Sequence, residues 1–118
     1  MLHDNPNRRE LLVVIDLLIF QSPANLYRGF EGVGGKLELA EELLHFVPHA
    51  INIQKDEEII YLRDIMRVEK INTLGIIPNG FKVTTTQQEY RFVVRKKDQW
   101  IAKINKQMKI ALSTFKDA

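Results

Sequence analysis

The sequence predicts a mainly β fold that ends in one C-terminal α-helix. Short segments rich in β-branched and aromatic residues recur at about eight-to-twelve-residue spacing, with turn residues between them. After the last segment, the apolar residues change to three- and four-residue spacing, which is typical of an amphipathic helix. A run of strands followed by one such helix indicates a small barrel or sandwich whose core the helix covers.

The composition indicates a single soluble domain. At 118 residues the chain can bury a core without disulfide or metal staples. It contains no cysteine, which excludes disulfides, cysteine zinc sites and thiol nucleophiles. The 17 basic and 15 acidic residues give a net charge of +2, too balanced to indicate nucleic-acid binding. We therefore expect a cytoplasmic protein without a nucleic-acid partner.

The N-terminal part predicts a tail and then the domain. Residues 1–10 are polar and predict a flexible tail, so the domain is expected to occupy residues 11–118. The apolar run at residues 11–20 contains Asp16 and is too short for a transmembrane helix, which needs about 20 apolar residues. Within this run, Leu11–Ile15 fits either a helical turn or a strand.

Nine segments then favour strands. We expect Ser22–Asn25 to separate the first strand, Leu17–Gln21, from the second, Leu26–Phe30, because the proline has no N–H to donate to a central ladder. Ala40–Glu42 reads as a hairpin loop, Arg63–Met66 as a single turn, and Asn79–Gly80 as a tight turn. The expected strands are Leu17–Gln21, Leu26–Phe30, Lys36–Leu39, Leu43–Val47, Ala50–Gln54, Glu58–Leu62, Val68–Ile71, Phe81–Thr85 and Tyr90–Val94.

Four glycines are concentrated at Gly29, Gly32, Gly34 and Gly35. A phosphate-binding loop is the alternative to consider, but such a loop opens a helix, whereas Gly35 leads into an expected strand. The glycines therefore predict bends or close approaches of the backbone, as at the corners of a small barrel.

The final helix is the most regular segment of the sequence. It is expected to begin near Asp98, as its N-cap, and to place one apolar face against the strands. That face consists of Trp100, Ile104, Met108, Ala111 and Phe115, and Ile101 and Leu112 widen it. The lysines lie around the rest of the cylinder.

Residues for catalysis are poorly represented. His45 and His49 are four residues apart, but in a predicted strand this spacing does not make a metal pair, and both are expected to be surface or rim histidines. The only serines, Ser22 and Ser113, have no recognisable activating partner. We therefore expect neither an enzyme nor a cofactor or metal site.

Several segments in order resemble the GRAM domain family. Gly35–Leu39 followed by Leu43–Phe46 is similar to its signature, and Thr73–Gly80 and Tyr90–Val94 followed by Asp98–Ile101 continue the likeness. The resemblance covers residues 17–106 and is closest to a stand-alone bacterial type. It implies a pleckstrin-homology-like barrel of about seven strands capped by the helix. One departure is the acidic segment Glu38–Glu42, where family members typically carry Tyr-Leu-Thr and a basic residue.

The candidate binding residues lie at the last strand and on the helix. Basic side chains with one exposed aliphatic among them suit weak binding to anionic phospholipid at a membrane surface, whereas the purely structural explanation is a solvated helix face. The alternative function is protein–protein interaction or formation of a homo-oligomer, with contacts near Phe30 or at Leu74–Pro78. The candidate lipid- or partner-binding residues are Arg91, Arg95, Lys96, Lys97, Lys103, Lys106, Lys109 and Ile110.

Overall fold

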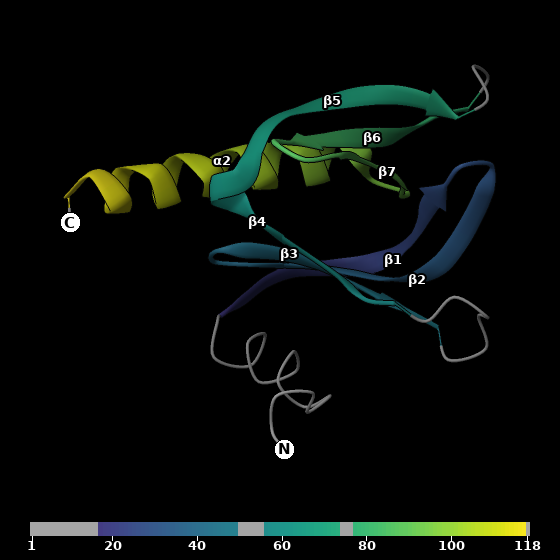
Figure 1. Cartoon of the computed structure of the whole chain (residues 1–118), viewed down its shortest axis with the longest axis horizontal. Coiled ribbons are helices and arrows are strands. Elements are labelled where there is room, and N and C mark those ends of the chain that lie inside the picture. Colours follow the sequence, from purple (N-terminus) through teal and green to yellow (C-terminus); the bar gives the residue numbers. More distant parts are fainter. Residues whose placement is uncertain (1–16, 50–55, 74–76, 118) are drawn as a thin grey trace.

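The computed structural model describes residues 17–49, 56–73 and 77–117 and contains seven strands and a long C-terminal helix (Figure 1). A short 3-10 helix, η2, occupies Leu62–Asp64, where a single turn was predicted one residue further on. The other elements are β1 (Leu18–Arg28), β2 (Glu31–Ala40), β3 (Leu43–Pro48), β4 (Glu58–Tyr61), β5 (Ile65–Thr73), β6 (Ile77–Thr85), β7 (Glu89–Val93) and α2 (Lys97–Asp117).

All seven strands form one antiparallel sheet in the order β4-β3-β2-β1-β7-β6-β5. The sheet folds over on itself, so that β5, β6 and β7 lie above β1, β2 and β3 in Figure 1, and β4 leads from one half to η2. In the described part of the chain β4 pairs only with β3 and β5 only with β6, so the sheet is not closed. The predicted fold class is confirmed, with an open seam between β4 and β5.

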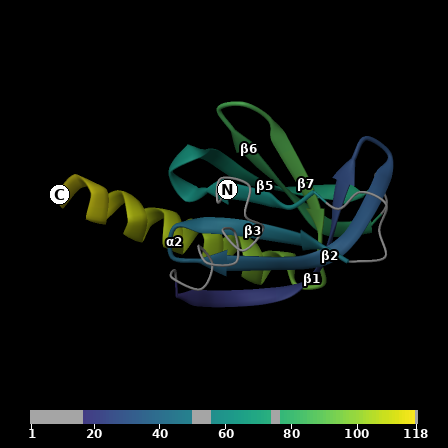
Figure 2. The ribbon, with the colours of Figure 1, turned by 60° about the horizontal axis from the view of Figure 1, so that its bottom comes forward.

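The core lies between the two halves of the sheet, and α2 seals one end of it. Trp100 and Ile104 on α2 are fully buried, as the apolar periodicity predicted. Leu112, which was expected to widen this face, is 57% exposed, because α2 extends past the strands there. The Trp100 ring meets Phe20 edge-on at 4.8 Å and stacks on Phe81 at 6.3 Å between centroids. Beyond this contact the C-terminal turns of α2 project past the strands (Figures 1 and 2).

Two predicted chain breaks are wrong. β1 continues through Pro23, which pairs with Lys36 of β2. The pairing of β1 with β7 begins only at Asn25, so Pro23 lies where β1 has a strand on one side, and its missing N–H is tolerated there. Asn79–Gly80 is not a turn but part of β6.

Glycines in this sheet permit close approach of neighbouring chains. A Cβ on Gly80 would lie 2.9 Å from the Phe92 carbonyl oxygen, and one on Gly35 would lie 2.8 Å from the Phe46 ring and against the Val47 carbonyl. The predicted close approach is therefore confirmed at Gly35. Among the described residues only Gly29, in the β1–β2 turn, has a positive φ, 67°.

Some predictions concern residues outside the described ranges. These are the N-terminal tail, the helix-or-strand question at Leu11–Ile15, the strand at Ala50–Gln54, and most of the Leu74–Pro78 loop. Near the other end, α2 begins at Lys97, so Asp98 lies in the first turn rather than at the N-cap.

Candidate functional site

The eight predicted binding residues fall into three groups rather than one. Arg91 lies on β7, and its guanidinium is 3.8 Å from Glu89 Oε1. Residues 95–97 form the connection between β7 and α2 and the first residue of the helix. The remaining four, Lys103, Lys106, Lys109 and Ile110, lie along α2. The structure therefore separates Arg91, which belongs to the charged network of the sheet, from the other seven.

Basic residues of the sheet have carboxylate partners, whereas those of α2 and its preceding connection have none within 4 Å among the described residues. Arg63 of η2 is an exception outside α2, because its guanidinium lies over the Tyr61 ring instead. The unpaired group consists of Arg95, Lys96, Lys97, Lys103, Lys106 and Lys109. The paired group consists of Arg28, Lys36, Arg67, Lys70, Lys82 and Arg91.

The basic residues before and at the start of α2, Arg95, Lys96 and Lys97, do not stabilise the helix. The N-terminus of a helix carries a partial positive charge, so Arg95, Lys96 and Lys97 are on the unfavourable side of the dipole. Asp98 in the first turn offsets part of this, but its carboxylate is 3.3 Å from Lys70 Nζ of β5. Lys103, Lys106 and Lys109 lie in the interior of α2, more than one turn from either end, where the dipole has little effect on them.

The first hairpin offers no unpaired basic residue for a phosphate group. Arg28 Nη2 is 3.2 Å from Glu58 Oε2 and donates to the Asp56 carbonyl at 3.0 Å. Lys36 Nζ is 3.2 Å from Glu38 Oε2. At the tip of this hairpin Phe30 is fully exposed. The hairpin therefore combines neutralised charge with one solvent-facing aromatic ring, which lies outside the eight predicted residues but in the region where contacts were predicted for the alternative protein-interaction function.

His45 is buried rather than a surface or rim residue, so that prediction is wrong. It lies on β3 opposite Glu38 of β2, and its ring contacts two carboxylates. Nδ1 is 3.1 Å from Glu38 Oε1 and Nε2 is 2.6 Å from Glu57 Oε1. A neutral imidazole has one N–H, so both contacts are hydrogen bonds donated by the ring only when it is protonated. On the solvent side of this cluster, Lys36 Nζ is 3.2 Å from Glu38 Oε2.

Little in the sequence indicates this cluster. Glu38 and Glu57 are nineteen residues apart in sequence, and only the pairing of β2, β3 and β4 brings both of them to His45. The described residues contain no group of three or more histidine, aspartate or glutamate side chains arranged to hold a metal ion. We therefore describe the cluster as a structural clamp that joins β2, β3 and the residue just before β4.

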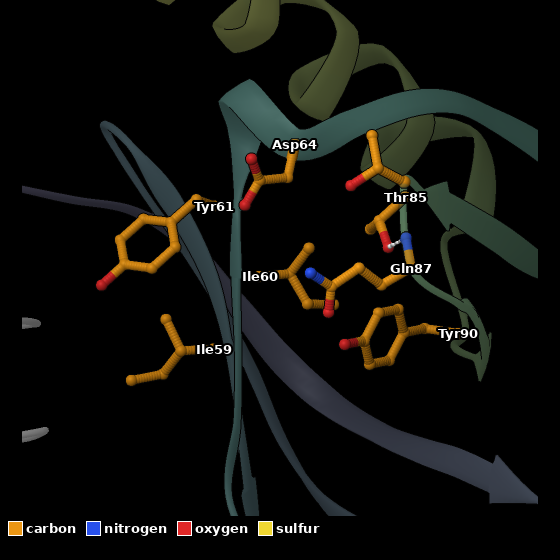
Figure 3. A pocket seen from close by; sticks show the side chains of 8 residues that line it. Ile59, Ile60, Tyr61, Asp64, Thr85, Gln87 and Tyr90 are labelled. Carbon is orange, nitrogen blue, oxygen red and sulfur yellow. Dashed lines mark hydrogen bonds between the residues drawn. The ribbon is translucent and has the colours of Figure 1, made fainter.

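A shallow cavity of about 180 Å³ lies at the open seam of the sheet (Figure 3). In Figure 3, Ile60 and Gln87 point toward each other across it, whereas Tyr61 points to the other side of β4. Its lining comes from β4, η2 and the β6–β7 turn and contains none of the predicted binding residues: Ile59, Ile60, Tyr61, Asp64, Thr85, Thr86, Gln87 and Tyr90. The cavity marks where the two halves of the sheet fail to join.

Comparison with known proteins shows the fold. No protein-family model matches the chain, and no curated protein matches it in sequence. Among solved structures, the C-terminal domain of a Leishmania infantum protein is similar with a TM-score of 0.73 at 14% identity, over 86% of this chain and 93% of that one. The N-terminal PH domain of human ARAP2 is similar with a TM-score of 0.63 at 17% identity, over 78% and 80% of the two chains.

A third similar structure is the PDZ-RhoGEF DH/PH fragment, solved in complex with activated RhoA. It has a TM-score of 0.70 at 16% identity, over 92% of this chain and 35% of that one. These likenesses define a pleckstrin-homology-like fold for this chain. Within the described residues, no helix combines the length and hydropathy that a membrane crossing requires.

Proposed function

We propose that this protein is a non-catalytic, GRAM-like binding module that associates weakly with anionic membrane surfaces, as a cytoplasmic protein bound peripherally. The observation that carries the proposal is the segregation of its charges. Among the described residues, basic side chains on the sheet lie within 4 Å of carboxylates, whereas those of Arg95, Lys96, Lys97, Lys103, Lys106 and Lys109 do not. Unpaired charges that lie together produce a local positive potential, which the net charge of +2 does not reveal.

The physical scale of this attraction fits weak and reversible binding. Each lysine or arginine close to an anionic membrane contributes about 1 kcal/mol, and salt screens the contribution. Recognition of a particular headgroup is not part of the proposal, because Arg28 and Lys36 in the first hairpin are held by Glu58 and Glu38.

Vesicle co-sedimentation tests the proposal. The full chain is expected to bind phosphatidylcholine vesicles containing phosphatidylserine at low salt, and to bind phosphatidylcholine alone far less. A variant with Arg95→Gln, Lys96→Gln and Lys97→Gln loses about 3 kcal/mol of attraction to the anionic membrane. It is therefore expected to bind the vesicles about a hundredfold more weakly. Failure of the wild-type chain to bind any anionic vesicle at low salt contradicts the proposed function.

A second candidate function is binding of a protein partner or of another copy of the chain. The observation that favours it is the free edge of β5, which pairs only with β6 among the described strands. An extended peptide can add to such an edge through backbone hydrogen bonds. The similar DH/PH fragment was solved in a complex with RhoA, which also favours a protein partner. Light scattering at rising concentration tests self-association, for which a constant monomer mass is the negative result.

A further inference from the structure

We propose that α2 and the start of β1 form one membrane-contact surface, in which Leu18 and Ile110 enter the apolar edge of an anionic bilayer while Lys103 and Lys106 contact its phosphates. The inference rests on the proposed function and specifies which side of the module meets the lipid. We call these residues, together with Leu17, the β1–α2 surface.

Side-chain contacts hold the first half of α2 against β1. The Lys103 ammonium lies over the Phe20 ring, 5.0 Å from its centroid. One turn earlier, Trp100 Nε1 donates a hydrogen bond to Ser22 Oγ at 2.9 Å. The side of α2 that carries Lys103 therefore faces the early part of β1.

A further contact extends this alignment toward the C-terminal half of α2. Gln107 Nε2 donates to the Glu41 carbonyl at 3.1 Å, and Glu41 follows Ala40, the residue paired with Leu18. Ile110 lies seven residues after Lys103, about two helical turns, and so returns to the same side of α2. These contacts place Leu18 and Ile110 toward the same side of the molecule, on either side of the loop that contains Glu41.

The apolar side chains of this surface are exposed. Leu17, Leu18 and Ile110 are 67%, 42% and 46% exposed. Lys106 lies between Lys103 and Ile110 along the helix, and neither lysine has a carboxylate within 4 Å among the described residues. Aliphatic side chains beside unpaired lysines are the two features that hold a helix in the interface of an anionic membrane.

Charge selects the bilayer over a second copy of the chain. In a two-fold interface each residue meets the same patch of its partner, so Lys103 and Lys106 of two copies would be brought together. The acidic side chains nearest to this surface, Glu41 and Glu42 in the loop that contacts Gln107, are fewer than the six unpaired basic residues of α2 and its preceding connection, so the repulsion is offset only in part. A phosphatidylserine-containing bilayer instead supplies phosphates and carboxylates at the level of the lysines and acyl chains at the level of the leucine and isoleucine.

Single-cysteine labelling tests the inference directly, because the chain contains no cysteine of its own. Leu18→Cys and Ile110→Cys are each labelled with an environment-sensitive fluorophore and mixed with phosphatidylcholine–phosphatidylserine vesicles. Leu112→Cys and Met66→Cys are matched controls, because both positions are exposed apolar residues, at 57% and 60%. Leu112 also lies about 200° around the helix from Ile110. Phe30→Cys reports the far hairpin.

The β1–α2 surface predicts a blue shift of emission at positions 18 and 110 and little change at 66, 112 and 30. A parallel binding assay compares wild type with Leu18→Ser/Ile110→Ser, which is expected to bind about tenfold more weakly. The inference is overturned if all labelled proteins bind vesicles but the emission shifts only at position 30, or at no position. The proposed function would then still stand. Absence of binding by the wild type overturns both. The inference is also overturned if the chain forms concentration-dependent dimers that Leu18→Ser/Ile110→Ser abolishes, and vesicles cause no emission shift at positions 18 or 110. That result would assign the surface to self-association.

Discussion

In the sheet, Lys82 reaches two carboxylates, Glu69 Oε1 at 3.6 Å and Glu89 Oε2 at 3.5 Å, whereas Lys106 and Lys109 on α2 have none within 4 Å in the described part of the chain. Both regions carry several basic residues, so their composition alone does not distinguish them. The difference lies in what surrounds each charge. A paired lysine has little field left to attract a ligand, while neighbouring unpaired lysines reinforce one another.

A second contrast lies within α2 itself. Its inner side is the closed end of the core, with Trp100 and Ile104 fully buried, and its outer side carries the unpaired lysines. Substitutions on the inner side should change stability, and substitutions on the outer side should change binding. The following predictions test that division, from the largest expected effect to the smallest.

Trp100→Ala is expected to lower the free energy of unfolding by about 3–5 kcal/mol, because it removes a buried ring packed against Phe20 and Phe81. Urea unfolding followed by circular dichroism measures this loss. Gln99→Ala, at the exposed neighbouring position, is the control and should change stability by less than about 0.5 kcal/mol. Equal effects of the two substitutions would show that α2 does not seal the core.

His45→Gln should cost about 2–3 kcal/mol, because it leaves Glu38 and Glu57 without their shared partner. The cost is below that of a fully buried pair, since the Glu57 side chain is 24% exposed. His49→Gln is the matched control, at an exposed position four residues along. If both variants unfold at the same urea concentration as wild type, the clamp contributes nothing to stability.

Gly35→Ala is expected to destabilise the β2–β3 pair by about 1–3 kcal/mol, because the new methyl group meets backbone at Val47 and Pro48 that cannot move freely. At Gly32 the added methyl would meet only the Tyr27 ring, at 3.2 Å, which can shift. Gly32→Ala should therefore cost less than Gly35→Ala in thermal unfolding, and the reverse order would contradict the close approach described here.

Lys106→Gln with Lys109→Gln should change the free energy of unfolding by less than about 0.5 kcal/mol. Both side chains are exposed and lie in the interior of α2, so neither the packing nor the ends of the helix depend on them. A loss above about 1 kcal/mol in urea unfolding would mean that these lysines stabilise the fold and would weaken their assignment to binding.

The fold was predictable because its signals are local. Turn residues between β-rich segments predicted most of the strands, and the spacing of Trp100, Ile104 and Met108 predicted the helix and its buried face. The errors at Pro23 and at Asn79–Gly80 have a common cause. Whether proline or glycine breaks a strand depends on which neighbour lies beside it, and that depends on the pairing of distant segments.

The candidate site was predictable only as a set of residues. The sequence indicates that Arg91 and Lys103 are both basic, but not that Arg91 lies beside Glu89 while Lys103 lies over Phe20. The His45 clamp was missed for a similar reason, since its two carboxylates come from other strands. The sequence likewise does not indicate that Leu18 and Ile110 are exposed on one side of the molecule, because that depends on the contact of α2 with β1.

One measurement tests most directly whether location, rather than net charge, governs binding. Lys106→Gln/Lys109→Gln and Arg67→Gln/Lys82→Gln each remove two positive charges, the first pair from α2 and the second from ion pairs of the sheet. Affinity for phosphatidylserine-containing vesicles at low salt should fall by about tenfold or more for the α2 variant and stay near wild type for the sheet variant. Equal losses in the two variants would contradict a membrane-contact site on α2.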